Sequence, residues 1–289
     1  MPSKTPAKKK AEGRARPEVS PQAKGRAKPA QPPPEPVKVQ TVEERTAELE
    51  ARLMEAPADL QAKYRDDLDM SWIAHDSALE GVVYTLPELR TAIGAADAMM
   101  AFDSSMQPVV EEIRRHREAL NFVREHALKR RQPLNIDTVK KIFCVLHPEE
   151  GDVKTVKYRK DIPQHRLYFH EYTAPDKIAY KLRQIVDWVN DPETRRTRTP
   201  VRLAARAHYD LLRVFPFATD SGKVARLVMN LLLLRAGYPP AIIHSTERQR
   251  YYEALKGSSA TMHSIVQDAI DNSLASIEKL LDIYEPPSR

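Results

Sequence analysis

Cysteine is almost absent from this chain of 289 residues, in which Cys144 is the single one. No internal disulfide can form, and we therefore expect a cytoplasmic protein, with a secreted protein that needs no disulfide as the alternative. Long apolar runs are also missing. The longest, 227–234, includes Asn230 and is far shorter than the ~18 apolar residues of a membrane-spanning helix. We therefore expect no membrane partner, and the basic N-terminus lacks the apolar segment of a secretory signal.

Residues 1–40 contain no aromatic residue and are rich in Lys, Ala and Pro. Such a segment cannot bury enough apolar surface to offset its conformational entropy, so we predict a disordered tail. Ten Lys and Arg against three Glu give it a charge of +7, one more than the +6 of the whole chain. The positive excess therefore belongs to the tail, which either contacts nucleic acid through charge alone or only aids solubility.

Helical patterns dominate from Thr41 onward, where Thr41-Val-Glu-Glu resembles a capping box. Periodic apolar residues, with Pro or Asn at several helix starts, predict helices. These are Pro87–Met100, Pro108–Arg130, Asn135–Leu146, Asp176–Val189, Pro200–Arg213, Gly222–Arg235 and Met262–Ile283. Tyr158–Thr173 is richer in aromatic β-formers and lies near two prolines, which predicts a short hairpin. The predicted class is all-α with one small β-hairpin.

A loop between two predicted helices carries the candidate chemistry. Residues 215–226 read Phe-Pro-Phe-Ala-Thr-Asp-Ser-Gly-Lys-Val-Ala-Arg, and Gly222 stands at the start of the second helix. Unpaired N–H groups and the helix dipole favour an anion there. Lys223 and Arg226 are three residues apart, so they share a helix face and predict a phosphate site. Asp220 opposes an anion unless a metal or a Lys neutralises it.

This stretch resembles the active-site motif of the Fic (Fido) family, His-Pro-Phe-x-(Asp/Glu)-Gly-Asn-Gly-(Arg/Lys)-x-x-Arg. Pro216, Phe217, Gly222 and Arg226 match the motif. Gly237-Tyr-Pro-Pro-Ala-Ile-Ile and Arg248-Gln-Arg-Tyr-Tyr-Glu-Ala-Leu also resemble family segments, and Tyr158-Arg159 resembles the start of the family's hairpin flap. The resemblance implies a Fic helical domain with a β-hairpin flap over residues 111–284, preceded by N-terminal helices in 41–110.

Residues 75–82, His75-Asp-Ser-Ala-Leu-Glu-Gly-Val, resemble the inhibitory helix of the family, (Ser/Thr)-x-x-x-Glu-(Gly/Asn). Glu80 and Gly81 match, whereas Asp76 takes the Ser/Thr position. The resemblance implies that Glu80 binds Arg226 and withdraws it from the γ-phosphate of a nucleotide. One guanidinium cannot hold a carboxylate and a phosphate in the same fork. The alternative is that Glu80 is an ordinary solvent-exposed helix residue.

The catalytic positions of the motif are altered. Fic enzymes transfer AMP from ATP to a protein hydroxyl, but Phe215 replaces the catalytic His and cannot accept a proton. General base catalysis contributes about 10²–10⁴-fold. Thr219 replaces the carboxylate that holds Mg²⁺, which prefers carboxylate ligands. Four residues nevertheless remain as a nucleotide site: Ser221, Gly222, Lys223 and Arg226.

We therefore predict an inactive or impaired protein adenylyltransferase that acts as a nucleotide- or protein-binding pseudoenzyme. ATP is the candidate ligand, a protein the expected partner, and no metal-ligating pattern of His or Cys is found to support Mg²⁺ or another metal.

Two alternatives stay open. A divergent, active transferase would move AMP or another phosphate-linked group with a different base, for which His165 and His170 in the predicted hairpin are candidates. His208 lies two turns before Phe215 and is expected to be structural, while His244 and His263 have no visible partner. A nucleic-acid-associated protein would depend on residues 1–40.

Overall fold

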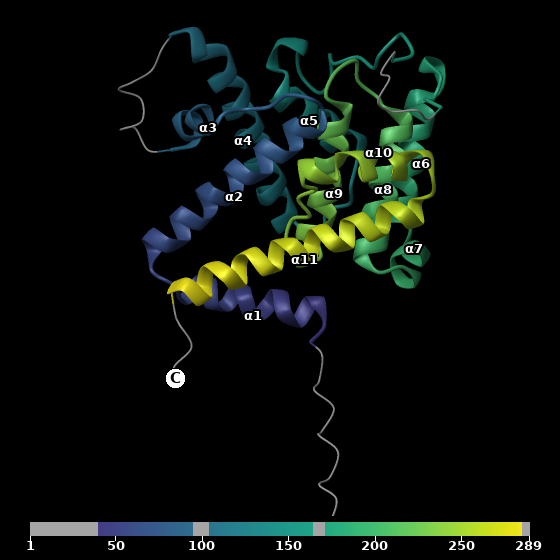
Figure 1. Cartoon of the computed structure of the whole chain (residues 1–289). Coiled ribbons are helices and arrows are strands. Elements are labelled where there is room, and N and C mark those ends of the chain that lie inside the picture. The colour runs from purple at the N-terminus through teal and green to yellow at the C-terminus, as the bar shows by residue number, and fades with distance from the viewer. Residues whose placement is uncertain (1–39, 95–103, 164–170, 285–289) are drawn as a thin grey trace, which may run out of the picture. The chain divides into compact units, whose positions relative to one another are not determined.

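The computed structural model describes residues 40–94, 104–163 and 171–284, which belong to one compact unit beginning at Gln40 (Figure 1). Within these ranges the secondary structure is helical and contains no strand. The helices are α1 Val42–Glu55, α2 Ala58–Leu79, α3 Leu86–Ile93, α4 Gln107–Leu128, α5 Ile136–Leu146, α6 Ile178–Asn190, α7 Pro192–Thr197, α8 Pro200–Val214, α9 Ser221–Arg235, α10 Arg248–Lys256 and α11 Ser259–Tyr284. Short 3₁₀ turns occupy Ser104–Met106, Pro148–Glu150, Pro175–Lys177 and Ser245–Glu247.

The predicted all-α class is confirmed, and most predicted helices agree with the observed ones to within a few residues. The helix predicted at Pro87–Met100 is an exception, because α3 ends at Ile93 and the chain from 95 to 103 lies outside the described residues. The parts of the predicted hairpin that are described, 158–163 and 171–173, contain no strand; its centre lies outside the described residues, so the hairpin stays a prediction. The predicted basic tail also lies outside them, except for Gln40.

Threonine caps begin several of these helices. In α1 the Thr41 hydroxyl accepts the Glu44 N–H at 3.1 Å, and Glu44 Oε2 accepts the Thr41 N–H at 2.9 Å, which forms the expected capping box. Thr85 and Glu88 repeat this arrangement at α3. These reciprocal bonds satisfy N–H groups that have no partner within the helix.

Helix α9 lies in the centre of the unit and packs against α8, α4, α5 and α2 (Figure 1). Its residues from Ser221 to Leu233 are all buried, including Lys223 and Arg226. A helix that is buried on every side is a core helix, and its first turn carries two cations into the interior. The fold therefore requires partners for both charges, because an unpaired buried cation is costly.

The sequence predicted no segment long and apolar enough to span a membrane. Among the residues that the structure describes, none of the helices combines the length and the apolar character that crossing a bilayer requires.

Candidate functional site

The loop 215–220 reverses the chain between α8 and α9. Phe215 and Asp220 have φ angles of 46° and 49°, in the left-handed region. Asp adopts this region more readily than most residues, and the Asp220 side chain is held by His147 and Lys223 at a position where the Fic motif has Gly. A bulky residue rarely adopts it, so Phe215 must be held there by its surroundings.

Arg159 supplies much of that support. Its Nε donates to the Phe215 carbonyl at 2.6 Å and its Nη2 donates to the Val214 carbonyl at 3.0 Å. Its backbone N–H donates to the Pro216 carbonyl at 3.0 Å. These carbonyls include ones at the C-terminal end of α8 that have no intrahelical donor. The buried guanidinium of Arg159 therefore fixes the backbone just before the loop.

The aromatic residues of the loop point into the core. Phe217 is fully buried and stacks on Phe143, with ring centroids 4.0 Å apart and an interplanar angle of 7°. The Phe215 ring is 3% exposed and lies edge-on to Tyr172 at 5.3 Å. The position that holds a catalytic His in the Fic motif is thus filled by a packed ring without a titratable group.

Ser221 closes the loop. Its hydroxyl accepts the Phe217 N–H at 2.8 Å and donates to the Phe217 carbonyl at 3.0 Å, and the side chain is fully buried. This hydroxyl is engaged by the loop itself, so we expect Ser221 to shape a nucleotide site rather than to contact a nucleotide. Gly222 is buried beside it in the first turn of α9.

Arg226 is held by two carboxylates of α2 and the turn that follows it. Its Nη2 lies 2.7 Å from Glu80 Oε1, and its Nε donates to Asp76 Oδ1. The side chains of Arg226 and Asp76 are each 3% exposed, and that of Glu80 is 11% exposed. The expected pairing of Glu80 with Arg226 is therefore present, in a shielded place, together with a second carboxylate that the sequence reasoning did not assign to Arg226.

Asp76 is held from two sides. Its second oxygen, Oδ2, lies 3.0 Å from Nε2 of His116, which is 2% exposed. Burial would raise the pKa of Asp76, but the charge of Arg226 and the contact with His116 outweigh it and lower that pKa. Asp76 is therefore ionised, and its attraction for Arg226 is strong in this poorly solvated place.

Tyr251 contacts the other end of the guanidinium. Arg226 Nη1 donates to its hydroxyl at 3.2 Å, and the hydroxyl lies 3.0 Å from Nε2 of His208. Burial, together with the charge of Arg226, lowers the pKa of His208 to about 3. His208 is thus a neutral, fully buried residue, as expected of a structural one.

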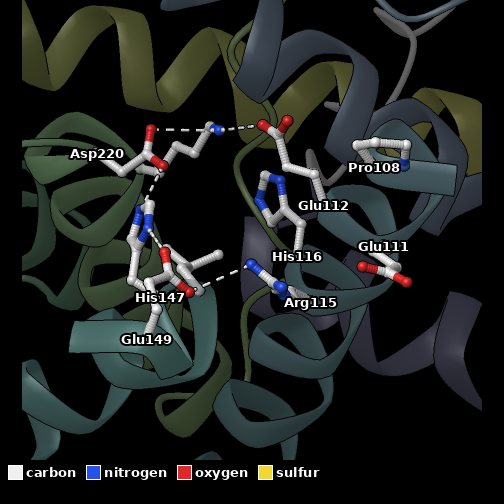
Figure 2. Close-up of a pocket in the computed structure, with 10 residues that line it drawn as sticks. Pro108, Glu111, Glu112, Arg115, His116, His147, Glu149 and Asp220 are labelled. Carbon is white, nitrogen blue, oxygen red and sulfur yellow. Dashed lines mark hydrogen bonds and ion pairs between the residues drawn. The ribbon is translucent and has the colours of Figure 1, made fainter. Parts of the chain in front are cut away.

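Lys223 is held by two further carboxylates. Its Nζ lies 3.2 Å from Asp220 Oδ1 and 3.4 Å from Glu112 Oε1, and the Lys223 side chain is 3% exposed (Figure 2). Burial works against the charged form, but Asp220, Glu112 and Asp76 outweigh it and raise the pKa of Lys223. Tyr84 donates to the same Glu112 oxygen at 2.6 Å.

Asp220 also binds His147, which follows α5. The two groups are 2.8 Å apart, and the other nitrogen of His147 lies 3.0 Å from Glu149 (Figure 2). The hydrogen bond to Asp220 raises the pKa of His147. Burial would raise the pKa of Asp220, but His147 and Lys223 hold it well below its usual range. These groups line a cavity of about 270 Å³ next to the loop.

A divalent metal finds a poor donor set around the loop. Thr219 is exposed, and both oxygens of Asp220 are already engaged by His147 and Lys223. Within the described ranges, no group of three or more His, Cys, Asp or Glu side chains has the geometry to hold a metal ion. Mg²⁺ would therefore have to be carried largely by nucleotide phosphates.

Several of these contacts were not anticipated from the sequence. The engaged residues that were missed are Asp76 as a ligand of Arg226, Glu112, His116, His147 and Tyr251. Asp76 precedes Glu80 by four residues, so helical spacing could have placed both carboxylates on one face. The prediction that His244 has no partner was wrong, because its ring stacks on His75 with centroids 4.3 Å apart. His165 and His170 lie outside the described residues.

Comparisons with known proteins agree with the motif. Residues 133–233 match the model of the Fic/DOC family. The chain is 30% identical over 256 residues to a protein adenylyltransferase Fic of Drosophila willistoni, which covers 85% of this chain and 49% of that protein. It is 29% identical to the protein adenylyltransferase fic-1 of Caenorhabditis elegans, over 75% of this chain and 42% of that protein. The chain thus spans about half the length of the curated relatives that it matches.

Solved structures show the same fold. A Fic domain containing signaling protein from Bacteroides thetaiotaomicron superposes with a TM-score of 0.66 at 19% identity, over 85% of this chain and 99% of that chain. Fic-1 from Caenorhabditis elegans superposes with a TM-score of 0.62 at 23% identity, over 86% of this chain and 74% of that chain. The motif at residues 215–226, the helical fold and these matches together show that the chain belongs to the Fic/DOC family.

Proposed function

We propose that this chain is an impaired or inactive relative of the Fic adenylyltransferases that binds a nucleotide, with ATP as the candidate, and a protein partner. The relatives are named protein adenylyltransferase, which supports AMP transfer as the ancestral reaction and a protein as the partner. The observation that carries the impairment is Phe215: the position of the general base holds a packed phenyl ring, 3% exposed, that cannot accept a proton.

The charges around the loop support a closed nucleotide site. Two cations, Lys223 and Arg226, are engaged by four carboxylates, those of Asp76, Glu80, Glu112 and Asp220. A triphosphate that approached the start of α9 would meet more negative than positive charge and no unengaged cation at these two positions. Nucleotide binding therefore requires that at least Arg226 exchange its carboxylates for phosphate oxygens.

Asp76 stands where the inhibitory motif of the family has Ser or Thr, and with Glu80 it holds Arg226 more strongly than Glu80 alone would. A second carboxylate, supported by His116, competes with any phosphate for the same guanidinium. Because the carboxylates come from α2 and its C-terminal turn, a movement of this segment releases Arg226. We propose that binding of the protein partner is coupled to that movement. A partner that favours the state with Arg226 released would also favour nucleotide binding.

A divergent active transferase would need another base, and His147 contacts the loop. Its two nitrogens face Asp220 and Glu149, and the hydrogen bond to Asp220 raises its pKa, which favours the protonated form that cannot act as a base. This favours an impaired or inactive protein over a divergent active transferase. A role in nucleic-acid binding would depend on the basic tail, which is outside the described residues.

Two assays on the full chain test the proposal. The protein is incubated with α-labelled ATP, Mg²⁺ and lysate, and ATP is titrated into purified protein by calorimetry. We expect no transfer of label above that of an Arg226→Ala control, and weak ATP binding that the same substitution removes. Robust labelling that depends on Lys223 or Arg226 would show an active transferase and overturn the impairment, whereas absence of ATP binding even after release of Arg226 would overturn the nucleotide site.

A further inference from the structure

A second cavity lies at the other end of α9 from the candidate nucleotide site. It has a volume of about 220 Å³ and is formed where α6, α7, the start of α8 and the end of α9 meet. Helix α9 runs from Ser221 to Arg235, and its 15 residues span about 20 Å at 1.5 Å per residue. The cavity is therefore separate from the contacts of Lys223 and Arg226.

Three arginines and no acidic residue line this cavity. The cationic residues are Arg195, Arg198 and Arg235, and the others are Val189, Pro200, Leu203, Leu232 and Ala236. In the described part of the chain none of the three arginines forms an ion pair with a carboxylate. Arg235 is half-buried and Arg195 and Arg198 are exposed, so the cavity combines an apolar floor with a rim of positive charge.

The nearest acidic residues along the chain are occupied. Asp191 caps α7 by accepting the Thr194 N–H at 2.7 Å, and Glu193 binds Arg196 at 2.9 Å. Neither of the two carboxylates lines the cavity. The positive charge is therefore left without an internal partner.

The arginines are held in place by neutral groups, which leaves their charge available. Arg195 donates through Nε to the Val189 carbonyl at 2.9 Å. Arg235 donates through Nη1 to the Gln132 carbonyl at 2.8 Å, but its Nε–H is buried and has no acceptor within hydrogen-bonding distance. Burial and the charge of Arg195 lower the pKa of Arg235, as expected for neighbouring cations without a counter-ion.

A buried donor without an acceptor is uncommon in a folded protein and calls for a physical explanation. Arg198 adds a guanidinium whose neighbour is the Trp188 ring, 5.8 Å from its central carbon. The Arg fork matches the planar geometry of a carboxylate, and the aliphatic residues around it match a short branched apolar group. A doubly charged phosphate would be desolvated by the same apolar walls at greater cost.

We propose that this cavity is a binding site for a carboxylate joined to a compact apolar group. Such a group occurs in a free branched-chain carboxylic acid and at the C-terminus of a peptide that ends in an aliphatic residue. A cavity of 220 Å³ is smaller than the roughly 300–1,000 Å³ of drug-sized sites, which limits the ligand to a group of this size. The carboxylate would lie between the arginines, within reach of their accessible Nη groups.

The test titrates 4-methylpentanoate, acetate, inorganic phosphate and a hexapeptide ending in leucine into the full-length protein, followed by ligand-observed NMR and calorimetry. We expect 4-methylpentanoate to bind at least about tenfold more tightly than acetate or phosphate, because only it satisfies both the arginines and the apolar walls. If the peptide also binds and the same peptide with a C-terminal amide does not, the carboxylate is that of a protein C-terminus. If only the free acid binds, the ligand is a small molecule.

Variants separate the site from a general effect of positive charge. Arg198→Gln, which gives up mainly a ring contact, should weaken binding of 4-methylpentanoate by about tenfold. Arg235→Lys keeps the charge but loses the planar guanidinium, and it should also weaken binding. Arg196→Gln removes an exposed neighbour that is absent from the cavity wall, and it should leave binding unchanged. No binding of the acid or the peptide, or equal affinities in Arg198→Gln and Arg196→Gln, would overturn the proposal.

Discussion

Nη2 of Arg226 lies 2.7 Å from Oε1 of Glu80, although the two residues are 146 positions apart in the sequence. Only the packing of α2 against the central α9 brings them together. Asp76 binds Nε of the same guanidinium, so two acidic residues at helical i, i+4 spacing hold a single cation. In our proposal this arrangement closes the start of α9 to phosphate as long as the end of α2 stays in place.

The first prediction concerns the stability that the two carboxylates provide. Asp76→Ala removes the more deeply buried partner and leaves Arg226 and His116 without its charge, so it should cost about 3–5 kcal/mol. Glu80→Ala removes a hydrogen bond to a charged group at a slightly exposed place and should cost about 2 kcal/mol. Urea unfolding measures both. Glu278→Ala is the matched control, because its pair with Arg45 is 36% exposed on the Glu side and is expected to contribute less than about 1 kcal/mol. A cost for Asp76→Ala no larger than that of the control would contradict the prediction.

A second prediction concerns Arg159. Arg159→Ala should destabilise the protein by about 3 kcal/mol, because buried carbonyls at the end of α8 lose their charged donor. Arg159→Lys should recover only part of this, since one ammonium cannot reach the Phe215 and Val214 carbonyls in the geometry of a guanidinium. Thermal unfolding ranks the variants. If Lys matched Arg, the fork geometry would be irrelevant to the loop.

The ion pair of His147 with Asp220 predicts a dependence of stability on pH. Folding raises the pKa of His147, so its contribution is complete below the ordinary value of 6.5 and is lost as the pH rises through the higher folded pKa. Folding lowers the pKa of Asp220, so its contribution is complete above the ordinary value of 3.8 and is lost as the pH falls through the lower folded pKa.

The melting temperature of the wild type should therefore exceed that of His147→Gln most clearly between about pH 4 and pH 6.5, and the difference should shrink toward about pH 9. His263 gives a control of opposite sign, because burial and Arg202 lower its pKa and it disfavours the folded state at acidic pH. A wild-type advantage over His147→Gln that grew with pH would contradict the ion pair.

Restoring catalysis should need two substitutions together. Phe215→His supplies a base without a metal anchor, and Thr219→Asp supplies an anchor without a base, so neither alone should yield AMP transfer. The double variant, with Asp76→Asn and Glu80→Gln added to release Arg226, should label a protein target with AMP. Labelling by wild type or by Thr219→Asp alone would show that another residue acts as base.

The sequence predicted the helical class and the pairing of Glu80 with Arg226, because both depend on local patterns and on a motif that was legible in the chain. It did not predict α2 as a long helix, since the buried face of α2 includes Asp69, Asp76 and Ser77 and so lacks an apolar stripe. Asp69 and Asp76 are buried there because they bind Arg side chains of other helices, which is tertiary information.

The contacts of Lys223 show the same limit. The sequence allowed a neighbouring Lys to neutralise Asp220, and Lys223 does lie 3.2 Å from it. Glu112 and His147, however, come from α4 and from the end of α5, and no local spacing connects them to the loop. The two cations beside the helix start lie in a cluster with carboxylates, and the phosphate cradle stays a prediction.

The most direct test of the central claim, that Asp76 and Glu80 close the proposed nucleotide site, is a calorimetric titration of ATP into wild type and Asp76→Asn/Glu80→Gln. These substitutions keep the shapes of both side chains and remove both negative charges. We predict that ATP binds the double variant at least about tenfold more tightly than wild type, and that Glu278→Gln, far from the site, leaves the affinity unchanged. Equal ATP affinity in wild type and the double variant would contradict the account.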